Sequence, residues 1–324
     1  MIWIEFFVCA LLLTFFAYNL CKEGVIISEK THLTEGVIGM FFLAIATSFP
    51  EIVTSSSSVF SLGRIGLGYG DIVGSIIVNS MILFGLDYFY NKGRVLARVS
   101  DLTKLTGFFV PIVVMAVLVA AGIRTLGINL LSFGKVGSES LIIVVVYFVY
   151  LRIIRRRGNT EHKSVHKTDE PFWKIWSKFA IFLIIVMFLG MWMALIGDKI
   201  VSVTTLSQTF IGTLVLGTAT SLPEIIVSFV AIKAASADMA VGNILGSNLF
   251  DICIIPFLDL LCGRPILGML TNGQMLATVL VFILSGLTVL GLLSRKDRPG
   301  RFSWDTGGIF GLGLVGFVFL YFIR

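Results

Sequence analysis

The sequence has few charged residues for its length. Only 14% of its 324 residues are Asp, Glu, Lys or Arg, whereas 56% are hydrophobic, and the mean hydropathy is +0.97. A soluble fold of this size does not need so much apolar surface. The scarcity of charge therefore excludes the soluble classes and predicts an all-α protein that crosses a lipid bilayer many times.

Histidine and cysteine are scarce as well. None of the three histidines lies in an apolar stretch, so a membrane-embedded enzyme with a Ser–His pair is excluded. The four cysteines, Cys9, Cys21, Cys253 and Cys262, show no metal-ligand spacing and are interpreted as packing residues. The sequence therefore predicts no enzyme, no cofactor and no zinc or copper site.

The formal net charge of +6 comes from basic residues in the loops between apolar stretches. A transmembrane orientation explains this pattern better than a nucleic-acid partner, which we do not predict. His162 and His166 lie in the longest polar segment, where a metal clip and a solvated linker are both open, with the linker favoured. The residues give no prediction of a protein partner.

Ten apolar stretches predict ten transmembrane helices. The polar segment 155–173 separates five of them (1–154) from the other five (174–324), so the two halves have opposite orientations in the membrane. Such inverted-topology repeats are typical of secondary transporters. The predicted helices span residues 2–20, 36–62, 70–90, 105–123, 137–154, 174–196, 208–233, 239–262, 273–293 and 307–323.

One segment occurs twice inside these stretches. Residues 44–55 read AIATSFPEIVTS and residues 217–228 read GTATSLPEIIVS, so Glu51 and Glu224 each follow a proline in an apolar span. An ionisable residue at that depth indicates a functional site. The two copies belong to longer repeats, about 36–90 and 208–262.

The repeat continues into the next helix of each half. Residues 70–79 (GDIVGSIIVN) align with residues 242–251 (GNILGSNLFD), and Asp87 aligns with Asp259. These two aspartates are expected near opposite membrane faces. A gating role and a helix-end carboxylate that snorkels to the interface are both open for them.

The repeats carry many hard oxygen ligands and no histidine or cysteine. Proline frees carbonyls one turn earlier, at residues 44–47 and 217–220, and helical spacing places hydroxyls beside each glutamate. This inventory favours calcium, sodium or potassium as the bound cation. The serine and threonine hydroxyls have an alternative role in back-bonding or helix packing. The candidate residues are Glu51, Glu224, Thr47, Thr220, Ser48, Ser221, Ser75, Ser247, Asn79, Asp251, Ala44 and Gly217.

The duplicated Gly/Ala-Thr-Ser-x-Pro-Glu and Gly-Asn/Asp-x-x-Gly-Ser segments resemble the two alpha-repeats of the calcium/cation antiporter superfamily. The similarity is to its sodium/calcium exchanger branch, in the short prokaryotic form. The resemblance implies that calcium is bound chiefly by Glu51 and Glu224, with carbonyls near Thr47 and Thr220.

The resemblance also implies a ligand set for sodium. Sodium would use the same two glutamates, the hydroxyls of Ser48, Ser221, Ser75 and Ser247, and the carbonyls of Ala44 and Gly217. Asn79 and Asp251 would complete the centre. The proton-coupled branch carries Gly-Asn-Ala-x-Glu in place of Thr-Ser-x-Pro-Glu, which argues against proton coupling here.

Two departures from the pattern stand in the first repeat, where Asp71 and Ile76 replace expected asparagines. The run 237–252 also resembles the potassium-dependent exchangers. Asp251 therefore either carries a proton during exchange, which we favour, or stays ionised and holds potassium.

The sequence as a whole indicates an antiporter that exchanges Ca²⁺ for Na⁺ by alternating access, with the first and sixth helices sliding over the core. Potassium-dependent exchange and H⁺/Ca²⁺ antiport are alternatives, and a calcium-permeable channel is a rival of a different class.

The loops also predict the orientation of the chain. Nineteen of the 25 Lys and Arg residues lie in loops that are cytosolic if both termini are extracellular. In a background without native cysteines, a cysteine at Asn159 is expected to react with an impermeant thiol reagent only from the cytosolic side. A cysteine at Ser202 is expected to react only from outside, and the opposite pattern would overturn this topology.

Overall fold

The computed structural model describes residues 1–29, 41, 43–90, 93–128, 130–157, 171–234, 236–294 and 303–323. Within these ranges the chain is almost entirely helical, as the need to satisfy backbone polar groups in lipid requires. The longer helices are α1 (Ile2–Glu29), α5 (Ile65–Tyr90), α6 (Asp101–Thr125), α7 (Ser138–Arg157), α8 (Phe172–Val203), α11 (Leu222–Lys233), α12 (Ala237–Cys262), α13 (Asn272–Leu293) and α14 (Trp304–Phe322).

Short elements connect or interrupt these helices. They are α3 (Ala44–Thr47), α4 (Phe49–Ser56), the π-helices η2 (Ser57–Ser61) and η4 (Ile211–Leu216), α9 (Gln208–Phe210), α10 (Gly217–Thr220), and the 3₁₀ turns η3 (Val95–Arg98) and η5 (Ile266–Met269). A two-stranded antiparallel hairpin, β1 (Ser132–Phe133) with β2 (Val136–Gly137), is the only sheet in the described part of the chain.

Seven helices in the described ranges are long and apolar enough to cross a membrane. The segments Gln208–Thr220 and Leu222–Lys233, bent by 40° against each other, make an eighth if they form one broken span. The chain is thus a multi-span helical membrane protein. Part of the predicted span 36–62 and most of the linker 155–173 lie outside the described residues.

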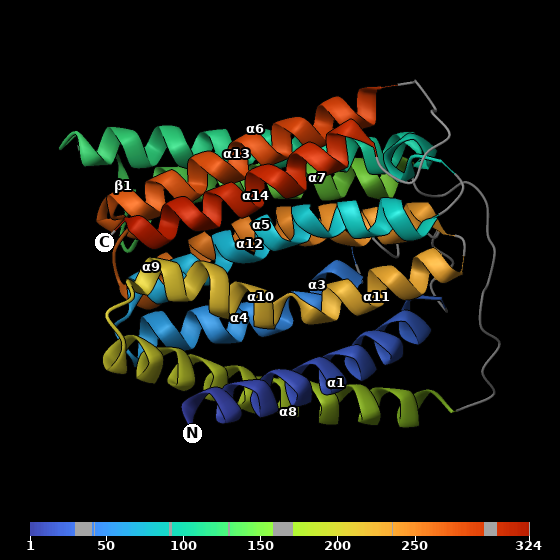
Figure 1. Cartoon of the computed structure of the whole chain (residues 1–324), viewed down its shortest axis with the longest axis horizontal. Coiled ribbons are helices and arrows are strands. Elements are labelled where there is room, and N and C mark those ends of the chain that lie inside the picture. Colours follow the sequence, from blue (N-terminus) through green and yellow to red (C-terminus); the bar gives the residue numbers. More distant parts are fainter. Residues whose placement is uncertain are drawn as a thin grey trace.

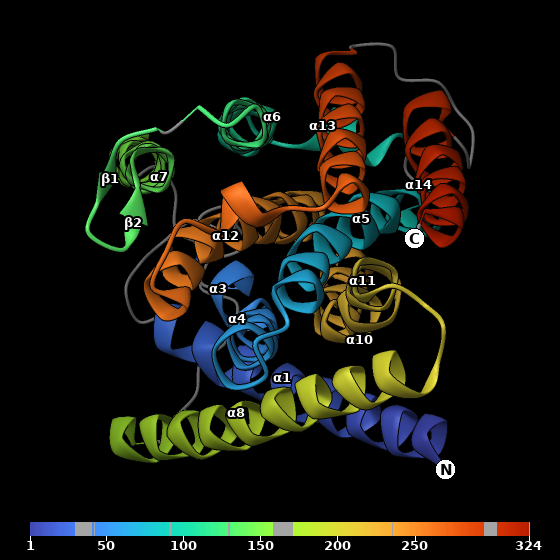
Figure 2. The same cartoon turned by 90° about the vertical axis from the view of Figure 1, so that its left-hand side faces the viewer.

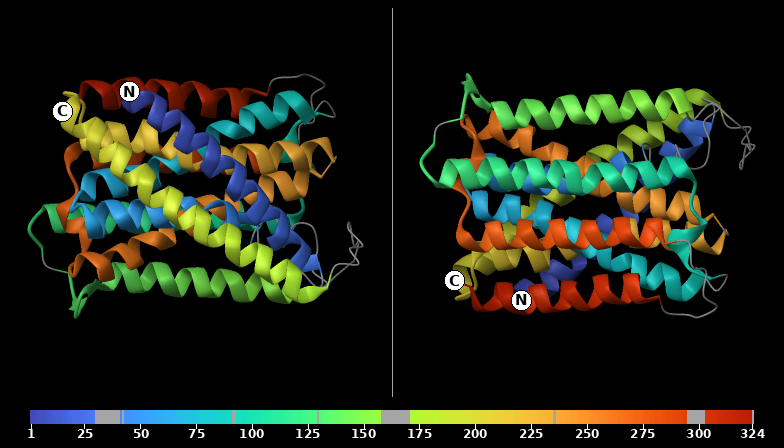
Figure 3. Two further views of the ribbon diagram at one scale, coloured as in Figure 1. Left: turned by 90° about the horizontal axis from the view of Figure 1, so that it is seen from below. Right: turned by 90° about the horizontal axis from the view of Figure 1, so that it is seen from above.

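The predicted stretches fall on helices, but α1 and α8 are longer than expected. The apolar stretch of α1 ends near residue 20, whereas the helix continues to Glu29, and α8 has 32 residues. A helix of that length measures about 48 Å, well beyond the roughly 30 Å of a bilayer core. Figure 3 shows α1 and α8 running side by side and obliquely across the other helices. Their tilt accommodates the extra length.

The helices form layers (Figures 1 and 2). The pair α1 and α8 covers one side, and the broken segments α3–α4 and α9–α11 come next. Helices α5 and α12 cross the centre. They are the most buried candidate spans, with 67% and 72% of their most apolar stretch buried inside the protein. Helices α6, α7, α13 and α14 cover the far side. The first half of the chain is thereby interleaved with the second.

The paired residues Asp87 and Asp259 are buried staples at helix ends. Asp87 accepts the main-chain N–H of Val95 at 2.7 Å and the hydroxyl of Thr306 at 2.9 Å. Asp259 accepts the N–H of Ile266 at 2.8 Å and the hydroxyl of Ser140 at 2.6 Å. Neither side chain snorkels, since both are buried. Each aspartate instead fixes the turn after its helix to the start of a distant helix.

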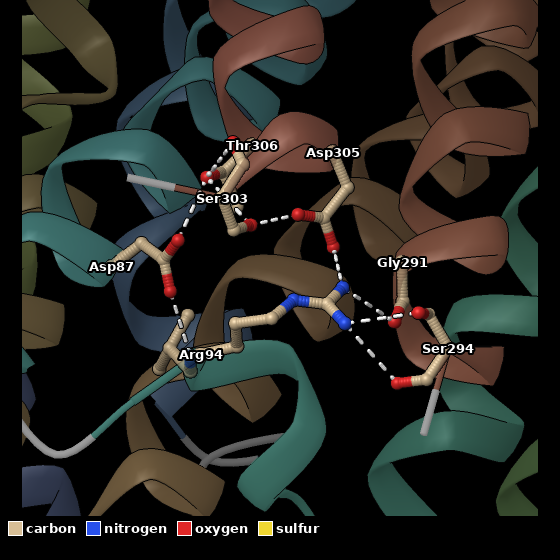
Figure 4. Close-up of polar contacts among 8 residues, drawn as sticks. Asp87, Arg94, Gly291, Ser294, Ser303, Asp305 and Thr306 are labelled. Carbon is tan, nitrogen blue, oxygen red and sulfur yellow. Dashed lines mark hydrogen bonds and ion pairs between the residues drawn. The ribbon is translucent and has the colours of Figure 1, made fainter. Parts of the chain in front are cut away.

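A buried ion pair reinforces the staple at Asp87. The Arg94 guanidinium pairs with Asp305 and donates to the main-chain carbonyls of Gly291 and Ser294, both at 3.3 Å (Figure 4). The pair therefore joins the turn after α5 to the end of α13 and the start of α14. Both side chains are buried, so water cannot take the place of either partner if that partner is removed.

Removal of one member of this pair is expected to destabilise the protein. The variant Arg94→Gln leaves the Asp305 carboxylate buried without its cation, which costs about 3–5 kcal/mol in comparable pairs. Thermal unfolding of purified protein in detergent measures the loss. The double variant Arg94→Met/Asp305→Leu removes both charges and is expected to recover most of it. Equal stability of the single and double variants would contradict this account.

Candidate cation site

The proline-containing repeats break two helices at equivalent serines. Ser48, between α3 and α4, has φ −80° and ψ 8°, and Ser221, between α10 and α11, has φ −80° and ψ 1°. Pro50 and Pro223 lack the N–H groups that would serve the carbonyls of residues 46 and 219. Both glutamates consequently lie in the first turn of a new helix inside the molecule.

Glycines bring the second break against α5. A Cβ atom on Gly74 would lie 2.1 Å from the Thr213 carbonyl oxygen, and a Cβ on Gly217 would lie 2.7 Å from the Gly74 carbonyl carbon. Thr213 belongs to η4, the π-helical segment that precedes α10. Only glycine permits this approach, which places the Gly217 carbonyl beside the serine that follows Gly74.

The two repeats exchange equivalent polar contacts across the centre. The Ser75 hydroxyl lies 3.3 Å from Glu51 Oε1, 3.4 Å from the Gly217 carbonyl oxygen and 3.1 Å from Thr220 Oγ1. These three contacts are repeated in the other half of the molecule.

In that other half, the Ser247 hydroxyl lies 3.5 Å from Glu224 Oε1, 3.5 Å from the Ala44 carbonyl oxygen and 3.2 Å from Thr47 Oγ1. In each half a serine contacts the glutamate of its own repeat and the broken helix of the other repeat. The contacts therefore have an approximate twofold symmetry.

Several polar side-chain atoms at this centre make no hydrogen bond within the described part of the chain. They include Oε2 of both Glu51 and Glu224, the Ser221 hydroxyl, and the polar side-chain atoms of Asn79 and Asp251. The Ser48 hydroxyl donates to Glu224 Oε1 at 3.4 Å. Buried polar atoms without partners are costly, and a bound cation or water would satisfy them, which makes this centre the candidate cation site.

The carbonyls of Ala44 and Gly217 keep helical hydrogen bonds. They accept the N–H groups of Ser48 at 3.0 Å and Ser221 at 3.2 Å, and each also accepts a serine hydroxyl, from Ser247 at 3.5 Å and from Ser75 at 3.4 Å. Among the described residues, no three His, Cys, Asp or Glu side chains cluster as a metal site by themselves. A cation held here would require hydroxyl and carbonyl oxygens as well, and their role as ligands stays a prediction.

The structure assigns partners to Asp71, for which the sequence offered no role. This buried carboxylate accepts the Ser55 hydroxyl at 2.8 Å and the Thr220 hydroxyl at 3.0 Å. Its repeat equivalent Asn243 accepts from Thr47 at 3.4 Å and donates to Ser228 at 3.0 Å. The alignment flagged the exchange of Asn for Asp, but only the fold shows that each residue meets the threonine of the opposite repeat.

A multi-span helical protein with buried carboxylates, hydroxyls and broken helices at its centre belongs to the class of membrane ion transporters. The family model for sodium/calcium exchanger proteins matches residues 1–155 and 174–323. The chain belongs to this family of ion exchangers.

Relatives extend across most of the chain. An uncharacterized membrane protein of Methanocaldococcus jannaschii, MJ0091, is 26% identical over 234 residues, which are 70% of each chain. The solved structure of the sodium-calcium exchanger NCX_Mj is similar at a TM-score of 0.66 and 24% identity, and covers 98% of this chain and 99% of that one. The H⁺/Ca²⁺ exchanger CAX is similar at a TM-score of 0.74 and 12% identity, with 99% and 86% covered. The likeness to both structures shows the fold and does not distinguish sodium from proton coupling.

The glycine contact predicts a specific sensitivity of the site. In Gly74→Ala the added methyl group would overlap the Thr213 carbonyl, so α5 must move away from α10 and Ser75 must leave the Gly217 oxygen. We expect calcium transport to fall by roughly tenfold or more, with a stability loss of about 1–3 kcal/mol. Gly286→Ala in α13 is the matched control, because nothing lies within 4 Å of its added Cβ. Equal transport by the two variants would contradict this packing.

Proposed function

We propose that the protein is a secondary antiporter that exchanges Ca²⁺ for Na⁺ by alternating access. The symmetric pair of contacts at Ser75 and Ser247 is the observation that carries this proposal. It brings Glu51 and Glu224, from two halves of the chain, to one oxygen-rich centre inside a membrane protein. Two carboxylates with hydroxyls and carbonyls suit calcium, and the same oxygens suit sodium.

The proposal includes ten spans arranged as two inverted repeats of five. In this arrangement α7 and the segment that contains α3, α4 and η2 count as spans, together with the eight candidates by length and composition. The equivalence of Asp87 with Asp259, each fixing the turn after its helix, supports the repeat. Residues 1–154 and 174–324 would form the halves, joined by the cytosolic linker 155–173.

Alternating access needs a part that moves relative to the site. Helices α1 and α8 lie side by side and are joined to each other where Glu5 accepts from Lys199 at 3.0 Å and from Trp192 at 2.9 Å. Arg64, just before α5, pairs with Asp198 of α8 at 2.6 Å at a partly exposed position. We propose that this pair of helices slides as a unit over the centre, with the exposed ion pair as a contact that can break at little cost.

Sodium is the proposed coupling ion because the repeats carry Thr-Ser-x-Pro-Glu rather than the segment typical of proton-coupled relatives. Asp251 keeps a second possibility open. Its buried carboxylate makes no hydrogen bond within the described residues and carries the negative charge that a potassium ion or a proton would neutralise. Asn79, the equivalent residue in the first repeat, is neutral and offers no such charge.

Transport in proteoliposomes tests the proposal. An outward sodium gradient is expected to drive calcium uptake, and a gradient of potassium or protons alone is not. Glu51→Gln and Glu224→Gln each remove one charge from a dication site and are expected to reduce calcium uptake by at least a hundredfold. Both variants should still insert, since loss of an unpaired charge makes a span easier to bury.

Asp101→Asn is the control, because it removes an exposed carboxylate at the start of α6, away from the site. Substantial uptake by either site variant would contradict the role of the glutamates. Uptake driven only by protons would overturn sodium coupling. Calcium flux that needs no counter-ion gradient and does not saturate would indicate a channel.

A further inference from the structure

The two halves of the site are unequal at one position. Asp71 on α5 and Asn243 on α12 occupy equivalent places, and each contacts a serine of its own repeat and a threonine of the other repeat. The first place holds a carboxylate and the second an amide. The two halves therefore differ in the charge of the residue that is hydrogen-bonded to a proposed ligand, Thr220 in one case and Thr47 in the other.

The carboxylate fixes the directions of its hydrogen bonds. An ionised carboxylate only accepts, so Ser55 and Thr220 must both donate to Asp71. The amide of Asn243 instead accepts a hydrogen bond from Thr47 and donates one to Ser228. The Ser228 hydroxyl in turn donates to the Ala240 carbonyl at 3.3 Å. Thr220 also lies closer to its partner, at 3.0 Å against 3.4 Å for Thr47. Each threonine has one proton and a second acceptor one turn earlier, the Leu216 carbonyl at 3.1 Å for Thr220 and the Leu43 carbonyl at 3.0 Å for Thr47. Hydrogen bonds to ionised acceptors are stronger, so the Asp71 carboxylate takes the Thr220 proton, whereas Thr47 lies nearer to the Leu43 carbonyl than to the neutral amide.

The hydrogen bond from Thr220 continues to the ion site. With its proton directed to Asp71, Thr220 presents only lone pairs to the centre, where its oxygen lies 3.1 Å from the Ser75 hydroxyl. Ser75 in turn contacts Glu51. Asp71 is itself fully buried and has no hydrogen-bonded partner in the described chain other than the two hydroxyls. No basic side chain cancels its charge there, so the charge acts on this half of the site.

We propose that Asp71 is a positioning residue that sets the calcium affinity of the site. It would do so by holding Thr220 as a donor and by making the half formed with Ser75 and Glu51 more negative than the other half. This inference rests on the proposed function of the site as a calcium site. It differs from a purely structural role because the second repeat folds with asparagine at the same place.

The substitution Asp71→Asn tests this role by giving the first repeat the side chain of the second. We expect the KM for calcium to rise roughly tenfold, without a comparable loss of maximal rate, because the binding free energy and not the fold is changed. The interaction of a fixed charge with an ion scales with the charge of that ion. The logarithmic shift should therefore be about twice as large for calcium as for the binding of one sodium ion.

The double variant Asp71→Asn/Asn243→Asp moves the carboxylate to the equivalent place in the other half. It is expected to bring the KM for calcium back towards the wild-type value, since Thr47 and Ser228 would then face the carboxylate. Thermal unfolding in detergent should be similar for all three proteins. An unchanged KM in Asp71→Asn, a loss confined to the maximal rate, or a double variant that is no better than the single would each overturn the proposal.

Direct binding of radiolabelled calcium to the purified proteins separates the two levels of inference. Wild-type protein that neither binds nor transports calcium would overturn the proposed function itself. Wild-type binding with an unshifted Asp71→Asn variant would overturn only the role of Asp71.

Discussion

The burial of carboxylates without basic partners is the constraint on which the rest of the structure depends. Glu51, Glu224 and Asp251 have no exposed surface, yet the ion pairs among the described residues all lie elsewhere, as in Arg94–Asp305 and Arg124–Glu139. An unpaired charge in an apolar medium costs several kcal/mol or more. Hydroxyl groups that contact Glu51 and Glu224 offset part of this cost. The remaining carboxylate oxygens have no partner in the described chain, and bound cations would satisfy them.

The backbone geometry follows from the same constraint. Hydroxyls and carbonyls reach the centre only if helices are broken and allowed to approach closely, which Pro50, Pro223, Gly74 and Gly217 permit. Broken helices need protein on all sides, because lipid cannot satisfy their free backbone groups. The long pair α1 and α8 supplies this cover on one side, and α5 and α12 supply it on the other (Figure 2). The staples at Asp87 and Asp259 then hold the outer helices to this core.

The sequence predicted the two helix breaks better than the packing around them, for a physical reason. Duplicated prolines and glutamates determine local backbone breaks, and the structure places both breaks at the predicted motifs, at Ser48 and Ser221. The tilt of α1 and α8 could not be predicted, because apolar stretches end before the helices do. Asp71 contacts Ser55, 16 residues away, and Thr220, 149 residues away, and Asp87 contacts Thr306, 219 residues away. Such contacts depend on how the repeats interleave, which residue spacing does not encode.

The distribution of charge between the repeats bears on how the ions are coupled. At the centre, the first repeat contributes Glu51 and Asp71 and the second contributes Glu224 and Asp251, so each half supplies two buried carboxyl groups there, at different places. One calcium ion neutralises at most two negative charges. If all four groups were ionised, a site that binds only calcium would keep a net negative charge in a medium of low dielectric constant. On the proposed function, a monovalent cation or a proton would therefore accompany calcium or take part in the return step. The position of Asp71 behind Thr220 and of Asp251 among unpartnered oxygens makes Asp251 the better placed of the two to hold that extra positive charge.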